Sequence, residues 1–267
     1  MRRTVRVWLT ALGAVAALLG GLFSLAGSAG AAVTGKAARS VPAVAGTYVP
    51  PKGTLGPGST GPAVKRLQER LNYLHYYSGR PDGQYGANTV DAVWAFKEAQ
   101  GIQTAVNPDD LTRAMKRALV HPKQPLVLVP NGGSWRIEVH LSLGYLVLYK
   151  HNVPELISHI SPGGGYYYPC PGDPGQTCGP AITPDGNYRA HWFAAGWVKV
   201  PLGEMYNPVF FIGGSYAIHG DTIVPLYAAS HGCVRIPMFI ANFFHKLVYV
   251  NETNGTPVYI RGHVPGT

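Results

Sequence analysis

The chain has 267 residues, a net charge of +9 and hydrophobic residues at 46% of its positions. This length is enough for one or two domains with a sizeable core, and 34 Gly with 23 Pro stays below the share typical of low-complexity disorder. The basic charge suits a nucleic acid, an anionic membrane or a cell wall as partner. Because the sequence shows no nucleic-acid-binding signature, we expect no nucleic-acid partner.

The N-terminus, residues 1–32, has the pattern of a secretory signal peptide. Three arginines within the first six residues precede an apolar stretch, and the small residues at 29–31 (Ala-Gly-Ala) offer a cleavage site. An uncleaved membrane anchor is the alternative, since the stretch is long enough to span a bilayer. In both cases the remaining chain is expected to work outside the cytoplasm, secreted or in the cell wall.

Residues 33–54 are rich in Ala, Gly, Pro, Val and Thr and are expected to form a flexible linker. Residues 55–120 then show helical periodicity. Apolar residues spaced by three and four positions predict a first helix, with one face formed by Val64, Leu67, Leu71 and Leu74.

Two further helices are predicted in the same region. Thr89 is expected to cap the second helix, and the run Asn107-Pro108-Asp109-Asp110 carries the signals of a third helix start, with Asn107 as cap. Three short helices around one small core predict a small N-terminal domain over residues 55–120, near the lower size limit for independent folding.

Residues 123–263 change to β-branched and aromatic runs, which Gly, Pro and Asn interrupt. This pattern predicts a mainly β domain. The segment "PMFIANFFHKLVYV" is the main exception, because its apolar residues have helical spacing. The expected fold class is therefore α+β and multidomain.

Three cysteines are present. Cys170 and Cys178 share a Gly/Pro-rich loop, and outside the cytoplasm such a pair can form a local disulfide. Cys233 is then the odd cysteine, and an unpaired thiol in an exported protein is a candidate for reactivity. Other pairings among the three stay open at this point.

Residues 215–237 contain several side chains that could take part in catalysis. A cysteine nucleophile needs a neighbouring base or cation, because a free thiol titrates at about pH 8.5. His219 and His231 could supply it to Cys233, and N–H groups near Gly232 could form an oxyanion hole. From spacing alone, a buried structural cysteine or a zinc site remains an alternative.

Two sequence stretches of the helical region resemble a known family. "GSTGPAVKRLQERLNYL" and "PDGQYGANTVDAVWAFKEAQGI", with the third helix, resemble the small peptidoglycan-binding domain of many wall enzymes. The later "DG…G..T" turn of that family is replaced by "TAVNPDD". The resemblance implies binding to peptidoglycan, with a helical spacer as the alternative.

The β region resembles a second family. "IHG" followed by "SHGCVRI" is similar to the signature of the L,D-transpeptidase family, also called the YkuD domain. "RIEVHLSLGYLVLYKHNVPELISHISPGGG", "ITPDGNYRAHW" and "MYNPVFFIGGSYAIHG" resemble its other segments, so the likeness spans nearly all of residues 123–263. It implies a β-sandwich-like catalytic domain with mixed sheets, in which the Cys170–Cys178 loop resembles an insertion.

The resemblance also implies residue roles. Cys233 corresponds to the nucleophile and His219 to the base, and Gly220 would orient the imidazole through its carbonyl. His231 and Gly232 would shape the oxyanion pocket.

Three further residues have weaker implied roles. Arg235 would steady the site or bind a substrate carboxylate, with a structural salt bridge as the alternative. Ser230 would form local hydrogen bonds. Tyr206 would line the substrate channel or belong to the core.

The function implied is that of an exported L,D-transpeptidase of cell-wall biosynthesis. It would form 3→3 peptidoglycan cross-links through a Cys233 acyl-thioester, with stem peptides as donor and acceptor and with no metal or organic cofactor. An L,D-carboxypeptidase, a non-catalytic peptidoglycan-binding protein and a zinc hydrolase are the alternatives.

Overall fold

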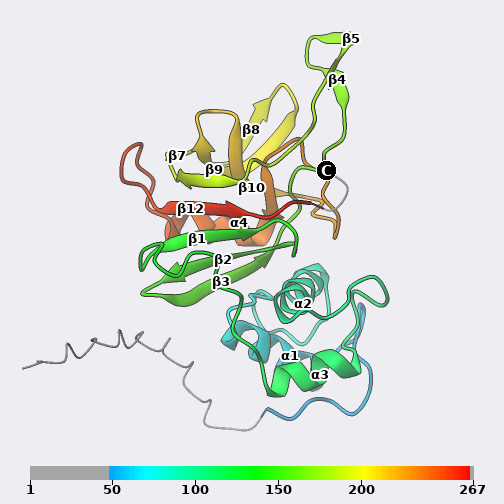
Figure 1. Ribbon diagram of the computed structural model, residues 1–267. Coiled ribbons are helices and arrows are strands. Elements are labelled where there is room, and N and C mark those ends of the chain that lie inside the picture. The colour runs from blue at the N-terminus through cyan, green and yellow to red at the C-terminus, as the bar shows by residue number, and fades with distance from the viewer. Residues whose placement is uncertain (1–47, 265–267) are drawn as a thin grey trace, which may run out of the picture. The chain divides into compact units, whose positions relative to one another are not determined.

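The computed structural model describes residues 48–264, so the predicted signal peptide and most of the predicted linker lie outside the described residues. Within the described part, no helix is both long and apolar enough to cross a membrane. The elements, drawn in Figure 1, are α1 Pro62–Tyr73, α2 Ala87–Gln100, α3 Arg113–Val120, β1 Arg136–His140, β2 Tyr145–Lys150, β3 Val153–His159, β4 Tyr168–Cys170, β5 Asp173–Cys178, β6 Gly186–Arg189, β7 Trp192–Phe193, β8 Trp197–Val200, β9 Gly203–Ile212, β10 Tyr216–Asp221, β11 Val234–Pro237, α4 Met238–Phe244, the 3-10 helix η1 His245–Leu247 and β12 Pro257–Arg261.

A helical region precedes a mainly β region with mixed sheets, as the sequence predicted. The described residues contain four α-helices, because α4 lies in the β region, where the apolar spacing of "PMFIANFFHKLVYV" predicted it. The apolar face predicted for the first helix is buried, and Leu74 is buried just beyond the end of α1.

The predicted starts of the second and third helices are wrong. Helix α2 begins at Ala87, and Thr89 lies inside it, where its Oγ1 accepts a hydrogen bond from Gln68 Nε2 at 3.0 Å. Helix α3 begins after Thr112, whose side chain accepts from the Met115 N–H. The tertiary hydrogen bond from Gln68 therefore overrides the capping signal at Thr89.

Residues 107–110 form a turn in place of the predicted helix start. Asn107 has a positive φ of 50°, which is incompatible with an N-cap in extended conformation. The buried ammonium of Lys97 donates to the carbonyl oxygens of Asn107 and Pro108, and Trp94 Nε1 donates to Asp109 Oδ1 at 2.8 Å. These contacts with α2 fix the "TAVNPDD" segment as a turn.

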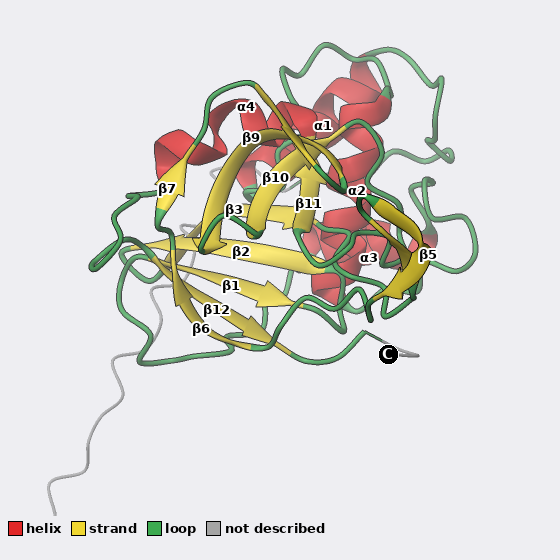
Figure 2. Ribbon diagram, turned by 90° about the horizontal axis from the view of Figure 1, so that it is seen from above, coloured by secondary structure: helices red, strands yellow, loops and turns green. Residues whose placement is uncertain are grey.

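Two five-stranded sheets form most of the β region. The first has the order β3-β2-β1-β12-β6, with β1 and β12 parallel. The second contains β11-β10-β9-β7, with β8 also paired to β9 and with β10 and β11 parallel. Figure 2 shows the strands of each sheet in this order.

Strand β2 is buried on both faces, which explains its nearly continuous apolar sequence. Leu146 and Leu148 point into a core cluster that holds residues of both sheets and of α4. Tyr145, Val147 and Tyr149 alternate with them and join the core of α1–α3. The helices therefore share one hydrophobic core with the first sheet.

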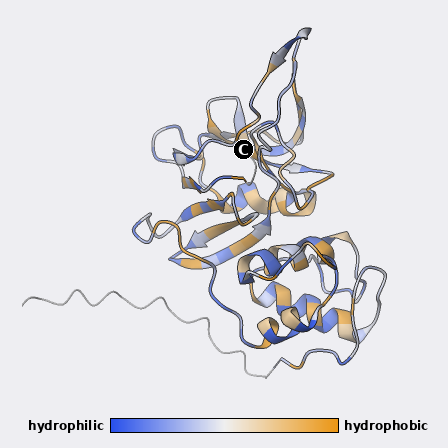
Figure 3. Ribbon diagram, turned by 45° about the vertical axis from the view of Figure 1, so that its right-hand side comes forward, coloured by the Kyte–Doolittle hydropathy of each residue, from blue (hydrophilic) through white to orange (hydrophobic). Residues whose placement is uncertain are grey.

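Helix α4 follows β11 directly and covers the core cluster of both sheets. Its buried residues are Ile240, Ala241 and Phe244. Figure 3 shows α4 coloured mainly as hydrophobic, whereas α1–α3 alternate between hydrophilic and hydrophobic stretches. Because α4 begins right after β11, it packs against the strands that carry the candidate site.

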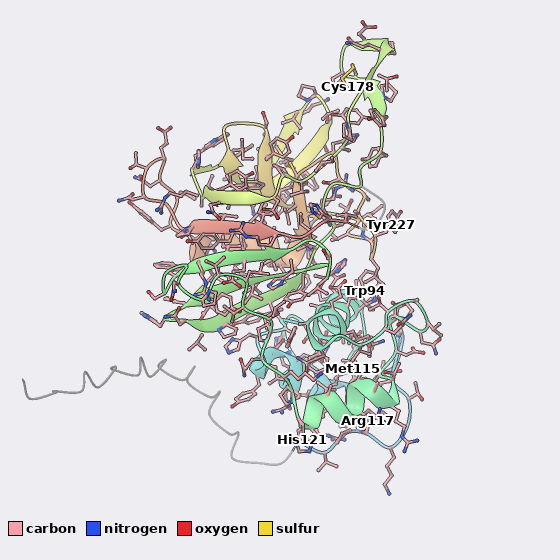
Figure 4. The ribbon with its side chains drawn as sticks, viewed as in Figure 1. Trp94, Met115, Arg117, His121, Cys178 and Tyr227 are labelled. Atoms are coloured by element: carbon pink, nitrogen blue, oxygen red, sulfur yellow. A yellow bond between two sulfur atoms is a disulfide. The ribbon has the colours of Figure 1, made fainter. Side chains whose placement is uncertain are left out.

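A two-stranded hairpin, β4–β5, projects from the β region in Figure 1. A disulfide joins Cys170 to Cys178 across it, and Figure 4 labels Cys178 on this projection. Most of β5 is exposed.

Candidate active site

Strands β10 and β11 bring the two parts of the sequence signature together. His219 lies in β10, and Cys233 immediately precedes β11. The strands are parallel, and His219 is the register partner of Arg235. Since alternate residues of a strand share a face, Cys233 and Arg235 lie on one face of the second sheet.

A cavity of about 430 Å³ opens at this point, and it contains most of the residues singled out from the sequence. Its lining comprises Tyr168, Pro171, Val200, Pro201, Leu202, Gly203, Glu204, Met205, Gly214, Ser215, Tyr216, His219, Ser230, His231, Cys233 and Arg235. The volume suits a ligand of a few residues.

His219 is buried, and its ring is oriented by the main chain. The Nδ1 atom lies 2.9 Å from the carbonyl oxygen of Gly220. A carbonyl oxygen only accepts hydrogen bonds, so Nδ1 carries the proton, and Nε2 of the neutral ring has a free lone pair. Burial lowers the pKa of His219, against the opposing effects of the Gly220 hydrogen bond and the Asp221 charge. The ring is therefore a neutral base at pH 7.

Cys233 is the free cysteine of the described residues and is half-buried at the cavity wall. Its Sγ lies 3.7 Å from the carbonyl oxygen of Ser215 and 3.9 Å from Met205 Sδ. Burial raises the pKa of the thiol, outweighing the hydrogen bond from Ala217 and the charge of Arg235. The resting group is thus a neutral thiol whose proton has an acceptor other than His219.

The turn before Cys233 is held by Ser230. The Ser230 hydroxyl donates to the carbonyl oxygen of Cys233 and accepts from the Gly232 N–H at 3.0 Å. Gly232 has a φ of 137°, and a Cβ there would lie 2.5 Å from the Tyr216 ring and 2.9 Å from the Ile182 carbonyl oxygen. Glycine is therefore required at 232 by both conformation and space.

Thr183 is a positioning residue that the sequence analysis did not single out. It is buried, and its hydroxyl accepts from the Gly163 N–H and donates to the carbonyl oxygen of Gly232, both at 2.8 Å. Its signal in the sequence is the threonine of "ITPDGNY", within the stretch "ITPDGNYRAHW" that carries a family resemblance.

His231 also lines the cavity, but its neighbours are aromatic. Its ring meets the rings of Tyr168 and Tyr166 edge to face, with centroids 4.5 Å and 5.5 Å away. Burial and the charge of Arg235 both lower the pKa of His231. The ring is therefore neutral at pH 7 and is one wall of the site.

Arg235 lines the cavity and also has an ion-pair partner. Its Nε lies 3.1 Å from Asp221 Oδ2, without the alignment of a hydrogen bond. Its main-chain N–H and carbonyl pair with Ser161. Arg235 thus ties β11 to the end of β10 and presents positive charge to the cavity.

Tyr206 is absent from the cavity lining. It packs against the main core cluster, and its hydroxyl donates to Asn242 Oδ1 at 2.8 Å. The neighbouring Met205 faces the cavity, since successive strand residues point to opposite faces. Gly220 lets this packing close, because a Cβ there would lie 2.7 Å from that of Ala241.

A zinc site has no support in the arrangement of side chains. Across residues 48–264, no group of three or more His, Cys, Asp or Glu side chains is placed to hold a metal ion. His231 packs on tyrosine rings, and the Nδ1 of His219 faces a carbonyl oxygen.

Comparisons with known proteins give matches to the helical region and to the β region. The family model described as "Putative peptidoglycan binding domain" matches residues 60–115. The structure of the L,D-transpeptidase (residues 123–326) from Xylanimonas cellulosilytica is 30% identical, with a TM-score of 0.69, and the match covers 80% of this chain and all of that one.

More remote likenesses include an L,D-transpeptidase from Stackebrandtia nassauensis, at 17% identity and a TM-score of 0.42, covering 79% of this chain and 96% of that chain. None of the curated proteins compared with the chain matches it. On the strength of the Xylanimonas likeness, the chain belongs to the L,D-transpeptidase (YkuD) family and carries a peptidoglycan-binding domain at residues 60–115.

Proposed function

We propose that this protein is an exported L,D-transpeptidase that forms 3→3 cross-links in peptidoglycan through an acyl-thioester on Cys233. One observation carries the proposal. A free cysteine and a buried neutral histidine, with one ring nitrogen fixed by a main-chain carbonyl, line the same cavity. These observations support the assignment of Cys233 as thiol nucleophile and His219 as its general base.

In the first step, Sγ of Cys233 attacks the carbonyl carbon between the third residue of a tetrapeptide stem, an L-centre, and its terminal D-Ala. His219 Nε2 takes the thiol proton as the C–S bond forms. The C–N bond then breaks, and the same proton passes to the leaving amine of D-Ala. Because the pKa of the thiol is raised and that of His219 is lowered, the resting pair is neutral, which favours proton transfer during the attack.

The thiol must turn before it reacts. In the structure its proton is directed at the carbonyl oxygen of Ser215, and rotation about the Cβ–Sγ bond of Cys233 frees it for another acceptor, which we assign to His219. Catalytic hydrogen bonds in ligand-free sites are often long and tighten with substrate.

The carbonyl oxygen that becomes negative in this step needs hydrogen-bond donors. The Gly232 N–H already donates to Ser230, so the Cys233 N–H is the donor of this turn that we assign to the oxyanion. The hydroxyls of Ser230 and Thr183 fix the turn through the carbonyl oxygens of Cys233 and Gly232.

In the second step a side-chain amine of a neighbouring stem attacks the thioester, with His219 as base, and Cys233 is released as the thiol. No metal or organic cofactor takes part in either step. Water in place of the amine would make the enzyme an L,D-carboxypeptidase. The peptidoglycan-binding domain would hold the enzyme on its polymer and raise the effective substrate concentration.

Intact-protein mass spectrometry with a carbapenem tests the nucleophile. We expect a single adduct on the mature protein and none on Cys233→Ala. A folded wild-type protein without an adduct would contradict an activated Cys233 and would favour a non-catalytic binding protein. Product analysis with disaccharide tetrapeptides then separates the two reactions, since transpeptidation gives a 3→3 dimer and carboxypeptidation gives only tripeptide.

A further inference from the structure

The β4–β5 hairpin stands beside the cavity, and the reaction described above does not use it. Residues 166–180, here called the hairpin arm, contain β4, a tight turn at Pro171–Gly172 and β5. The Cys170–Cys178 disulfide closes the arm on itself. Cys170 is buried, whereas residues 171–177 are exposed.

The chain segments that flank the arm on both sides are hydrogen-bonded to the turn that carries Cys233. On the incoming side, the Ser230 N–H donates to the carbonyl oxygen of Pro162 at 3.0 Å. On the outgoing side, Thr183 donates to the carbonyl oxygen of Gly232. The Ala181 N–H donates to the carbonyl oxygen of Tyr166 at 2.9 Å and joins the two ends to each other. The base of the arm is thus a fixed part of the catalytic turn.

Two tyrosines place the arm against His231. The Tyr168 ring lies edge to face on the His231 ring, and the Tyr166 hydroxyl donates to the carbonyl oxygen of Ala229 at 3.0 Å. Tyr168 and Pro171 line the same cavity as Cys233. Val200–Leu202, at the turn between β8 and β9, line it as well.

We propose that Tyr168 and Pro171 of the hairpin arm contact the donor stem peptide, and that the Cys170–Cys178 disulfide holds them in place. The arm is then a specificity-determining part of the active site. The proposal rests on the proposed function, because the donor is the ligand whose carbonyl must reach Cys233 in the free enzyme. The Tyr168 ring and Pro171 offer an apolar wall that can pack against apolar parts of the stem, such as the methyl group of its terminal D-Ala.

The test compares two reactions of Cys233 in the mature full-length protein by intact-protein mass spectrometry. Acylation by a synthetic tetrapeptide stem, as a function of its concentration, reports on donor binding. Alkylation by iodoacetamide reports on the thiol itself, since so small a reagent needs no contact with the arm.

We expect Tyr168→Ala to lower the second-order acylation rate constant about tenfold, through a higher half-saturating stem concentration, as for other buried aromatic contacts. Alkylation should change by less than about twofold. Tyr168→Phe should behave as wild type, because the ring makes the contact. Tyr167→Ala is the matched control, since Tyr167 is 68% exposed and lies outside the cavity lining.

The double variant Cys170→Ser/Cys178→Ser should shift acylation in the same direction as Tyr168→Ala and leave alkylation unchanged. A Tyr168→Ala protein that is acylated with wild-type constants would overturn the role of the arm while the transpeptidase function stands. A wild-type protein that iodoacetamide alkylates but no stem peptide acylates would remove both proposals.

Discussion

Two buried histidines of the β region differ in what their ring nitrogens do. His219 has one nitrogen held by the Gly220 carbonyl. His159, at the end of β3, has both nitrogens engaged: Nδ1 lies 2.9 Å from the Glu98 carboxylate, and Nε2 lies 3.1 Å from two carbonyl oxygens, those of Val224 and Pro225. The first histidine keeps a lone pair for chemistry, and the second joins helix α2 to the loop after β10.

Burial alone does not distinguish them, but their protonation does. Burial lowers the pKa of His219 and, with the charge of Arg235, outweighs the Gly220 hydrogen bond and the charge of Asp221. Burial also acts to lower the pKa of His159, but the charge and hydrogen bond of Glu98, with Asp91, outweigh it and raise the pKa. Burial raises the pKa of Glu98 to about 7. A histidine paired with a carboxyl group thus shares a tightly bound proton, and an unpaired one is kept neutral as a base.

The geometry around His159 requires one shared proton. Nε2 faces carbonyl oxygens and must carry a hydrogen, so the proton between Nδ1 and Glu98 is the one that titrates. Either His159 or Glu98 can hold it, and the hydrogen bond persists in both cases. Removing it leaves two lone pairs facing each other in a buried site, which is unfavourable.

The largest expected effect follows from His219→Ala. Acylation by a stem peptide should fall by about 10²–10⁴, the usual contribution of a general base, while the free energy of unfolding stays near that of wild type. His159→Ala is the matched control and should show the reverse, with lower stability and nearly normal acylation of the folded protein. Equal losses of acylation in the two variants would contradict the assignment of His219 to catalysis and of His159 to structure.

The pH dependence of acylation sharpens the same contrast. His219 must be neutral to act as base, and its pKa lies below the ordinary histidine value of about 6.5. The acylation rate should therefore rise with pH below about 6.5, as His219 loses its proton. It should keep rising at alkaline pH, because burial raises the pKa of Cys233 and leaves it a thiol near neutrality. A limb at or above pH 7 that His219→Ala leaves unchanged would contradict this assignment.

Breaking the Glu98–His159 pair should reduce stability. Glu98→Ala leaves a buried imidazole without its partner, which costs about 3 kcal/mol of unfolding free energy. Both groups have a raised pKa and bind protons more tightly when folded. Their stabilisation is therefore present at low pH and lost as pH rises from about 4.5 through about 7, the ordinary and the folded pKa of Glu98.

Urea unfolding between pH 5 and 8 measures this effect. Glu98→Gln can donate its amide to Nδ1 without a titrating proton, so its stability should depend less on pH than that of wild type. A pH slope in Glu98→Gln as steep as in wild type would show that the pair does not share the proton.

Thr183→Val should have an intermediate effect that is confined to the catalytic turn. It removes one hydroxyl with two buried hydrogen bonds, which costs about 1–3 kcal/mol, and it loosens the turn that aims Cys233. Acylation should fall about tenfold, because small displacements of reacting groups reduce rates strongly. Thr183→Ser keeps the hydroxyl and should restore most of the rate. Failure of Thr183→Ser to do so would point to the lost methyl group as the cause.

The sequence predicted a helical region before a mainly β region, and five residues that it singled out line the cavity: His219, Ser230, His231, Cys233 and Arg235. Periodicity marks helices and strands, and the short segment from His219 to Cys233 needs only two parallel strands to close the site. Features that depend on distant contacts were missed. Thr89 and Asn107 carry cap signals that tertiary hydrogen bonds from Gln68 and Lys97 override. The contact of Tyr168 with His231 has no local signal.

The smallest expected effect comes from Tyr206→Phe. This variant tests whether the two faces of β9 have different roles. Loss of the hydroxyl bond to Asn242 at the edge of the core should lower the unfolding free energy by about 0.5–1 kcal/mol. Acylation should stay within about twofold of wild type, because Tyr206 is absent from the cavity lining. Met205→Ala is the matched variant on the opposite face, where Sδ lies 3.9 Å from Cys233 Sγ, and it should slow acylation several-fold. If both variants slowed acylation alike, β9 would act on the site through its backbone, and the separation of a chemical face from a packing face would fail for this strand.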